Sequence, residues 1–247
     1  MRIVTVIPAR MGSSRFPGKP LADICGLPMI EHVRRRAELN TKISEVIVAT
    51  CDQEIYAKVI DYGGKAVMTS ETHVRCTDRV AEVAAGIDAD VIVNLQGDEP
   101  LFMPELLDPL LSPLEDKNVL CTNLMEKIYN VDEFRSKNAV KVVCNKKNDA
   151  LYFSRSPIPH DDNGAIESPC KQLGVIAFRK DFLLKFSSLP PTPLEKAESV
   201  DMLRALEHGF QIRMVLSPFI SRGVDTPEDL EDVAERMKTD TLYLKKY

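Results

Sequence analysis

Residues 3–21, IVTVIPARMGSSRFPGKPL, join a short apolar run to an irregular loop that carries three cations. The β-branched residues in 3–7 are typical of a strand buried on both faces. Behind them, Arg10, Arg15 and Lys19 lie among glycine, serine and proline residues, which favour turns. In an open α/β sheet, ligands bind beyond the carboxyl ends of the strands, so this loop is a candidate binding site.

The same alternation continues through the first half of the chain. Apolar runs at 45–50, 65–69 and 90–95 are separated by amphipathic stretches at 28–39, 54–63 and 78–87. This order predicts a mostly parallel sheet with right-handed helical crossovers. After Pro104, strand-like runs at 118–125, 139–145, 150–159 and 173–179 are joined by polar turns, which predicts hairpins and a mixed sheet. We expect one domain over residues 1–247 with a smaller inserted sheet.

Three further segments have recognisable local patterns. A helix is expected over about residues 194–208, with Leu203 and Leu206 on its apolar stripe. The last helix is expected to begin in DTPEDLEDVAERM, where Thr226 can cap and Pro227 fits the first turn. Residues 160–170, HDDNGAIESPC, have turn composition and predict an exposed loop.

Composition excludes several classes of protein. The net charge of -5 and pI near 5.5 argue against a general nucleic-acid binder, which needs an excess of Lys and Arg. Six cysteines without a CxxC pair suggest reduced thiols in a cytoplasm. No apolar run approaches the roughly 18 residues of a membrane span. We therefore expect a cytoplasmic protein that has no membrane span and does not bind nucleic acid.

The cationic loop has two interpretations. A Gly/Ser-rich turn near a helix can bind anions through its backbone amides, and the three cations could neutralise a triphosphate. The loop matches neither GxxxxGKS nor GxGxxG, so it is not a P-loop or a Rossmann fingerprint. The alternative is a solvated basic turn, although its position after the first strand favours phosphate.

Two aspartates could hold a metal. Asp98 follows an apolar strand in VNLQGDEP, and Asp225 follows an apolar residue in RGVDTPEDL. Carboxylates at strand ends suit Mg²⁺, which prefers oxygen ligands and bridges substrate phosphates. Taken singly, GDEP could be a plain turn and Asp225 an Asx turn or helix cap.

Arg155 lies between aromatic residues and prolines in YFSRSPIP, where a guanidinium could bind a substrate carboxylate through two hydrogen bonds. A surface salt bridge is the alternative. Among the histidines, His73 stands out because it precedes VRCTDR, a turn that enters a helix. No GxSxG elbow or Ser-His-Asp order supports nucleophilic hydrolysis.

Seven motifs, in this order, resemble the 3-deoxy-manno-octulosonate cytidylyltransferases, also called CMP-Kdo synthetases: IPARMGSSRFPGKPL, VIVNLQGDEP, NAVKVV, ALYFSRSPIP, LGVIAFR, PLEKAESVDMLRALEHG and GVDTPEDLE. The resemblance runs nearly end to end. It implies an α/β, three-layer, Rossmann-like nucleotidyltransferase fold with a mostly parallel central sheet and a smaller inserted mixed sheet. It also implies Mg²⁺-dependent transfer of CMP from CTP to an acidic 2-keto-3-deoxy sugar, with release of pyrophosphate. A homodimer is implied, with an acceptor-binding and dimerisation subregion around residues 119–180.

The resemblance also implies a role for each motif residue. Arg10, Lys19 and Asp98 would be catalytic, and Asp98 and Asp225 would bind the metal. The nucleotide-binding residues would be Arg10, Met11, Gly12, Ser13, Arg15, Lys19, Arg75, Cys76, Thr77, Arg79 and Gln96. The acceptor-binding residues would be Gln96, Arg155, Gln172, Glu198 and Asp201.

Three departures from the family pattern bear on the acceptor. Arg75-Cys76 stand where the family usually has Ser-Gly, Gln172 where it has His, and Asp201-Met202 where it has Glu-Gln. The acceptor could therefore be Kdo with a repacked pocket, or another acid such as 8-amino-Kdo, a nonulosonate or a small phosphonate. A non-catalytic nucleotide-binding protein is the remaining alternative, which the joint presence of Lys19, Asp98 and Asp225 disfavours.

Overall fold

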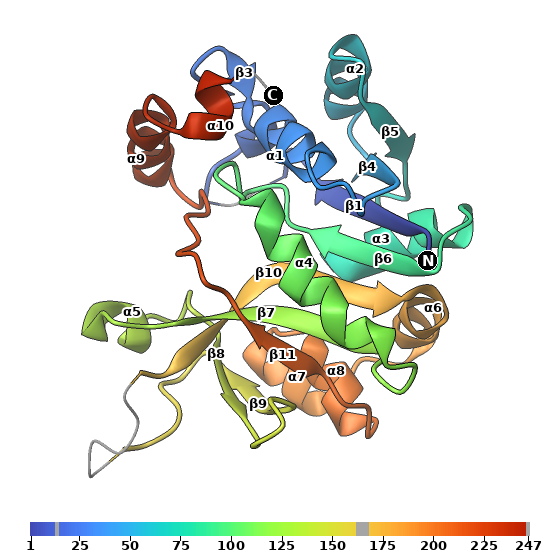
Figure 1. Ribbon diagram of the computed structural model, residues 1–247, viewed down its shortest axis with the longest axis vertical. Helices are drawn as coiled ribbons and strands as arrows, with labels where there is room; N and C mark the ends of the chain where they lie inside the picture. The colour runs from blue at the N-terminus through green and yellow to red at the C-terminus, as the bar shows by residue number, and fades with distance from the viewer. Residues whose placement is uncertain (13–14, 162–167, 246–247) are drawn as a thin grey trace. The chain divides into compact units, whose positions relative to one another are not determined.

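The computed structural model describes residues 1–12, 15–161 and 168–245, and its backbone contacts divide the chain into two compact units (Figure 1). The first unit comprises residues 1–107 and 221–247, and the second comprises residues 108–220. The second unit is thus inserted into the first. It extends beyond the 119–180 subregion named above at both ends.

The first unit contains four parallel strands in the order β6-β1-β4-β5. Their bounds are β1 Ile3–Ala9, β4 Glu45–Thr50, β5 Lys65–Met68 and β6 Val91–Leu95. Every residue of β1 and β6 is buried. This is expected of strands covered on both faces, and it explains their unbroken apolar runs.

Crossover helices connect these strands: α1 Met29–Glu38, α2 Gln53–Asp61 and α3 Cys76–Ala85. The chain moves outward from β1 to β4 and β5, and then returns through α3 to β6 on the other side of β1. Because such crossovers are right-handed, α1 and α2 cover one face and α3 the other, as Figure 1 shows for α1 and α3. The direction reverses between β1 and β6, so a ligand site is expected at their carboxyl ends.

Shorter elements complete the first unit and its boundary. The chain returns after residue 220 and forms α9 Pro227–Met237 and α10 Thr241–Leu244. The remaining elements of the first unit are the 3₁₀ helices η1 Lys19–Leu21 and η2 Pro104–Leu106 and the strands β2 Asp23–Ile24 and β3 Leu27–Pro28. Helix α4 Leu107–Leu111 spans the boundary, and the 3₁₀ helix η3 Ser112–Glu115 belongs to the second unit. Thr226 and Asp229 form a capping box at the start of α9, which confirms the predicted helix start.

The second unit contains a mixed sheet, as predicted. Strand β7 (Cys121–Lys127) pairs in parallel with β11 (Arg213–Leu216) and antiparallel with β10 (Cys170–Arg179). Strand β8 (Lys141–Cys144) pairs antiparallel with β9 (Ala150–Ser154) and with the start of β10. Helices α5 (Val131–Arg135) and α6 (Lys180–Ser188) precede two short helices, α7 (Pro193–Glu198) and α8 (Met202–Glu207).

The segments 194–208 and 160–170 were predicted to be a helix and a loop. The single helix expected over 194–208 is wrong, because Ser199 adopts a left-handed conformation (φ 54°) that ends α7 before α8 begins. Most of the predicted loop at 160–170 lies outside the described residues. Within the described ranges, no helix has the length and apolar character needed to cross a bilayer.

Candidate functional site

A pocket opens at the carboxyl ends of β1 and β6, where the strand order reverses. It lies wholly within the first unit. Its walls come from the end of β1 and the loop after it, the turn into α3, the segment after β6, and Asp225 ahead of α9. The lining residues are Pro8, Ala9, Arg10, Gly12, Arg15, Lys19, Pro20, Met29, His73, Val74, Arg75, Cys76, Arg79, Gln96, Gly97, Asp98 and Asp225.

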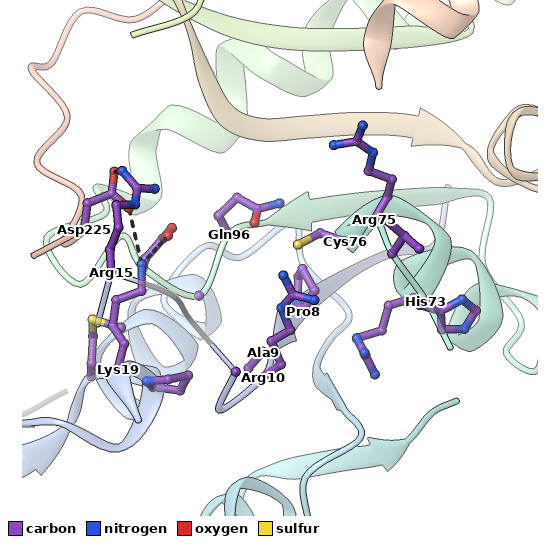
Figure 2. Close-up of a pocket in the computed structure, with 17 residues that line it drawn as sticks. Pro8, Ala9, Arg10, Arg15, Lys19, His73, Arg75, Cys76, Gln96 and Asp225 are labelled. Atoms are coloured by element: carbon purple, nitrogen blue, oxygen red, sulfur yellow. Dashed lines mark hydrogen bonds and ion pairs between the residues drawn. The ribbon is translucent and has the colours of Figure 1, made fainter. Parts of the chain in front are cut away.

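The charges of the lining suit a polyanion. Five arginine or lysine side chains line the pocket, against two aspartates. Figure 2 shows Arg15, Lys19 and Asp225 at one end, with His73 and Arg75 at the other. A concave site with a cationic surplus concentrates phosphate-bearing ligands, although the whole chain is acidic.

Lys19 is the centre of the charged end of the pocket. Its side chain is only 12% exposed, and its ammonium lies 2.8 Å from Asp98 Oδ2 and 3.5 Å from Asp225 Oδ1. It also donates to the carbonyl oxygen of Val224 at 2.7 Å. The two carboxylates, far apart in sequence, therefore face the same ammonium group.

The segment before α9 is fixed so that Asp225 can face this ammonium. The Val224 amide donates to the Asp98 carbonyl at 2.8 Å, and the Asp225 amide donates to Asp229 Oδ2 at 2.9 Å. Thr226, rather than Asp225, caps α9. The Asp225 carboxylate instead accepts from Arg15 Nη1 at 3.0 Å, so the helix-cap interpretation of Asp225 does not hold.

Position 97 favours glycine because the backbone behind the pocket is closely packed. A Cβ there would lie 3.1 Å from the Pro8 carbonyl oxygen and 3.1 Å from Ile30 Cδ1. The backbone between β6 and Asp98 must therefore pass close to the end of β1. Gly97 and Asp98 lie in a turn, and this turn brings the Asp98 carboxylate against Lys19.

At the other end, the turn into α3 contributes a histidine, two arginines and a thiol. His73 Nε2 lies 2.5 Å from Glu82 Oε2. The Ser70 amide and His73 lower the pKa of Glu82 by hydrogen bonding to its carboxylate. Cys76 is exposed and is the first residue of α3. Arg79 is 3% exposed and donates to Thr69 Oγ1, and to Cys51 Sγ at 3.4 Å.

Most of the residues predicted to bind nucleotide line this pocket. The exceptions are Met11, Thr77 and Ser13. Thr77 is buried, with its Oγ1 accepting from Asn94 Nδ2 at 3.5 Å, because it lies on the face of α3 that packs on the sheet. Met11 contributes backbone groups, with its amide donating to Asp52 Oδ2 at 2.8 Å. Ser13 lies outside the described residues.

Asp52 and Glu99 are polar residues of the site region that sequence reasoning missed. Asp52 tethers the start of the cationic loop through Met11, while Glu99 Oε2 accepts from Ser221 Oγ at 2.5 Å. Asp52 lies two residues after the end of β4, and a polar residue at that edge of the sheet could have indicated it.

The remaining predicted acceptor residues belong to the second unit. The Arg155 guanidinium donates to three backbone carbonyls, those of Glu198 (2.7 Å), Lys137 (2.8 Å) and Ser199 (3.3 Å). Glu198 accepts from Ser154 Oγ at 2.7 Å and from the Arg155 amide at 2.7 Å. The structure thus brings Arg155 and Glu198 together, and among the described residues no carboxylate forms a salt bridge with the Arg155 guanidinium.

The positions in the second unit that depart from the family pattern have different surroundings. Gln172 Nε2 donates to Asn123 Oδ1 at 2.7 Å. Asp201 is the N-cap residue of α8, and its charge adds to burial in raising the pKa of the Cys121 thiol. Met202 is fully buried. Its side chain is part of the apolar core.

Comparison with known proteins agrees with the pocket and its motifs. Residues 4–214 match the family model described as Cytidylyltransferase. A 3-deoxy-manno-octulosonate cytidylyltransferase of Geobacter metallireducens is 47% identical and covers 96% of this chain and 98% of its own. One from Solibacter usitatus is 45% identical, covering 98% and 96%.

Solved structures give the same relationship. The structure described as CMP:2-keto-3-deoxy-manno-octonic acid synthetase complexed with CTP superposes with a TM-score of 0.91 at 43% identity, covering 97% of this chain and 99% of that one. With the mostly parallel sheet, the switch-point pocket and near full-length identity above 40%, the chain belongs to the 3-deoxy-manno-octulosonate cytidylyltransferase family.

Proposed function

We propose that the protein transfers CMP from CTP to 3-deoxy-manno-octulosonate, releasing pyrophosphate. One observation supports this proposal most strongly: the side chains of Lys19, Asp98 and Asp225 lie together in the pocket of the first unit. The relatives above are named for this reaction, and one solved structure is described as complexed with CTP. The alternative of a non-catalytic nucleotide binder does not account for two carboxylates beside a phosphate-binding lysine.

The cationic loop would hold the triphosphate. Arg10, Arg15 and Lys19 line one pocket, and their charges offset the phosphate charge that grows on the leaving pyrophosphate. The anomeric hydroxyl of the acceptor would attack the α-phosphorus in line. The bond from that phosphorus to the oxygen bridging to the β-phosphate would break, and the hydroxyl proton would be lost. The enzyme would contribute position and charge rather than a covalent intermediate.

Mg²⁺ dependence is part of the proposal. Asp98 and Asp225 fit this ion, because both present carboxylate oxygens to one cationic group, and hard oxygen donors are the ligands Mg²⁺ prefers. Among the described residues, no group of three or more His, Cys, Asp or Glu side chains could hold a metal. Substrate phosphates and water would complete the coordination. When bound, the ion would reduce phosphate charge and lower the pKa of the attacking hydroxyl.

The acceptor is assigned to Kdo over other acids. Met202 is buried in the core, so in the Asp201-Met202 departure only Asp201 is accessible to an acceptor. Gln172 is held by Asn123, and Arg75 and Cys76 line the pocket of the first unit. Arg155 and Glu198 would contribute to the acceptor site as a joined pair.

Pyrophosphate release from CTP and Mg²⁺ tests this function with a panel of acceptors: Kdo, 8-amino-Kdo, N-acetylneuraminate and a small phosphonate. We expect the highest kcat/KM with Kdo. Turnover with another acid and none with Kdo would refute the acceptor, and binding of CTP without turnover on any acid would support a non-catalytic role. Omission of Mg²⁺, or its replacement by EDTA, is expected to abolish turnover.

We also propose a cytoplasmic homodimer whose contacts involve the second unit. All six cysteines carry thiols rather than disulfides, as expected for a reducing compartment. Tyr129 (74% exposed) and Val131 (61% exposed) border an apolar hollow in the second unit. Light scattering coupled to size-exclusion chromatography would test the dimer, and cell fractionation would test the location.

A further inference from the structure

Lys141 is a fully buried lysine with a complete set of hydrogen bonds, and no carboxylate of the described residues forms a hydrogen bond or salt bridge with it. Its residue exposure is 0%. The ammonium donates to the carbonyl oxygens of Ser136 (2.8 Å), Ala139 (2.6 Å) and Arg155 (2.6 Å). An ammonium has three donors, so these three carbonyls use all of them.

The same cluster contains a second cation. Lys141 binds the carbonyl of Arg155, and the guanidinium of Arg155 is itself held by backbone carbonyls. Among the described residues, Glu198 is the one carboxylate that contacts this cluster, through the Arg155 amide and the Ser154 hydroxyl. Lys141, Arg155 and Glu198 therefore carry a net positive charge before any ligand binds.

This excess charge has a cost that a bound anion would offset. Burial lowers the pKa of Lys141, the charge of Arg155 lowers it further, and Glu198 raises it. A buried cation without an ionic partner is unfavourable, and a carboxylate brought close to Arg155 would be stabilised by both positive charges. A lysine needed only to bridge carbonyls gains nothing from a neighbouring cation.

We propose that Lys141 is a positioning residue for the acceptor: it fixes the backbone of Arg155 from behind and adds a second positive charge to the site that takes the acceptor's carboxylate. This inference rests on the proposed function, in which Arg155 binds that carboxylate. Lys141 itself is buried and does not touch the acceptor.

Two variants separate charge from hydrogen bonding. Lys141→Met removes both, whereas Lys141→Gln removes the charge and keeps an N–H₂ donor group near the carbonyls. Lys147→Met is the matched control, because Lys147 is an exposed lysine of the turn between β8 and β9 in the same unit. KM for Kdo, KM for CTP and kcat are measured for each variant, together with the melting temperature.

We expect both Lys141 variants to raise KM for Kdo about tenfold or more, since an interaction of a charged group is lost. KM for CTP should stay within about twofold, and Lys147→Met should match the wild type in all constants. If Lys141→Gln has the wild-type KM for Kdo, the positive charge of Lys141 does not contribute to acceptor binding. If KM for Kdo and KM for CTP rise by the same factor, Lys141 has a structural role and does not position the acceptor. Should Lys141→Met fail to fold, Lys141→Gln decides alone.

Arg155→Ala, measured alongside, distinguishes failure of this inference from failure of the proposed function. If Arg155→Ala leaves KM for Kdo unchanged while Kdo is still turned over, the assigned role of Arg155 is wrong and the inference falls with it. If Arg155→Ala raises KM for Kdo and the Lys141 variants do not, only the inference is wrong.

Discussion

Replacement of Asp98 by asparagine tests the charged end of the pocket most directly. Asp98 Oδ2 lies 2.8 Å from the Lys19 ammonium, and the Asp98 side chain is 34% exposed. Asparagine has nearly the same shape and can still accept a hydrogen bond through its carbonyl oxygen. The change therefore removes one negative charge and little else.

The expected effect on stability is small. At an effective dielectric constant of about 20, unit charges at this separation attract by ~6 kcal/mol, but desolvation and solvent screening offset most of that attraction. Because Asp98 is partly exposed and Lys19 keeps Asp225 and the Val224 carbonyl as partners, we expect a net loss of about 0–1 kcal/mol, which moves the melting temperature of a chain this long by ~2–4 °C at most. The fold should therefore survive.

The expected effect on turnover is large. A carboxylate that holds a cation against the phosphates acts in the transition state, and losing one such electrostatic group typically costs about 10²–10³ in kcat. The assay is pyrophosphate release with CTP, Kdo and Mg²⁺, run beside thermal unfolding. Asp232→Asn is the control, because Asp232 pairs with Arg236 at 2.7 Å on α9, away from the pocket lining.

An Asp98→Asn enzyme that keeps more than about a tenth of wild-type kcat would remove Asp98 from the catalytic site. A melting temperature lowered by far more than the control would show that the residue is structural instead. Full activity in the control is required for either conclusion.

Three further changes have distinct expected outcomes. Asp52→Ala removes the acceptor of the Met11 amide, so KM for CTP should rise about fivefold with little change in kcat. Gly97→Ala places a Cβ 3.1 Å from the Pro8 carbonyl, and chemical denaturation should show a loss of about 1–3 kcal/mol. Burial lowers the pKa of His32, so the unfolded state binds more protons there; stability should fall as the pH drops below about 6.5 and level off below the lowered folded pKa.

Each of these changes has a matched control. Asp61→Ala removes an exposed aspartate at the end of α2 and should leave KM for CTP unchanged. Gly86→Ala places a Cβ no closer than 3.7 Å to the Val83 carbonyl and should be nearly neutral. In His32→Gln the amide can still donate to the Ile24 carbonyl, and the dependence of unfolding on pH near 6 should flatten. A Gly97→Ala protein as stable as Gly86→Ala, or an unchanged pH profile in His32→Gln, would contradict the reasoning.

Much of the fold was predictable because its signals are local. The unbroken apolar runs at β1 and β6 reflect burial on both faces, and the alternation with amphipathic stretches reflects parallel strands joined by helices. The start of α9 was equally readable, since Thr226, Pro227 and Asp229 interact over a few residues. The break at Ser199 was not, because serine rarely adopts the left-handed backbone that the structure shows there.

The chemistry-bearing residue types were also visible in the sequence, as cations after the first strand and aspartates after apolar runs. For each of these residues, the local sequence pattern did not distinguish a binding role from an ordinary turn or helix cap. For Asp225 the structure excludes the helix-cap role, because the neighbouring residue Thr226 caps α9. For Asp98 the turn is present, and the same turn brings the carboxylate to Lys19.

What the sequence by itself determined, then, is the class of fold and the list of candidate residues, since strand burial, helix periodicity and capping depend on neighbours within a few positions. Tertiary structure alone decided which candidates meet. Lys19 reaches the backbone of Val224, 205 residues away, because the chain returns to the first unit after residue 220. It likewise decided that Met202 is core and that Arg155 is held by carbonyls over a buried Lys141, because long-range contacts follow from packing of whole elements and leave no local periodicity.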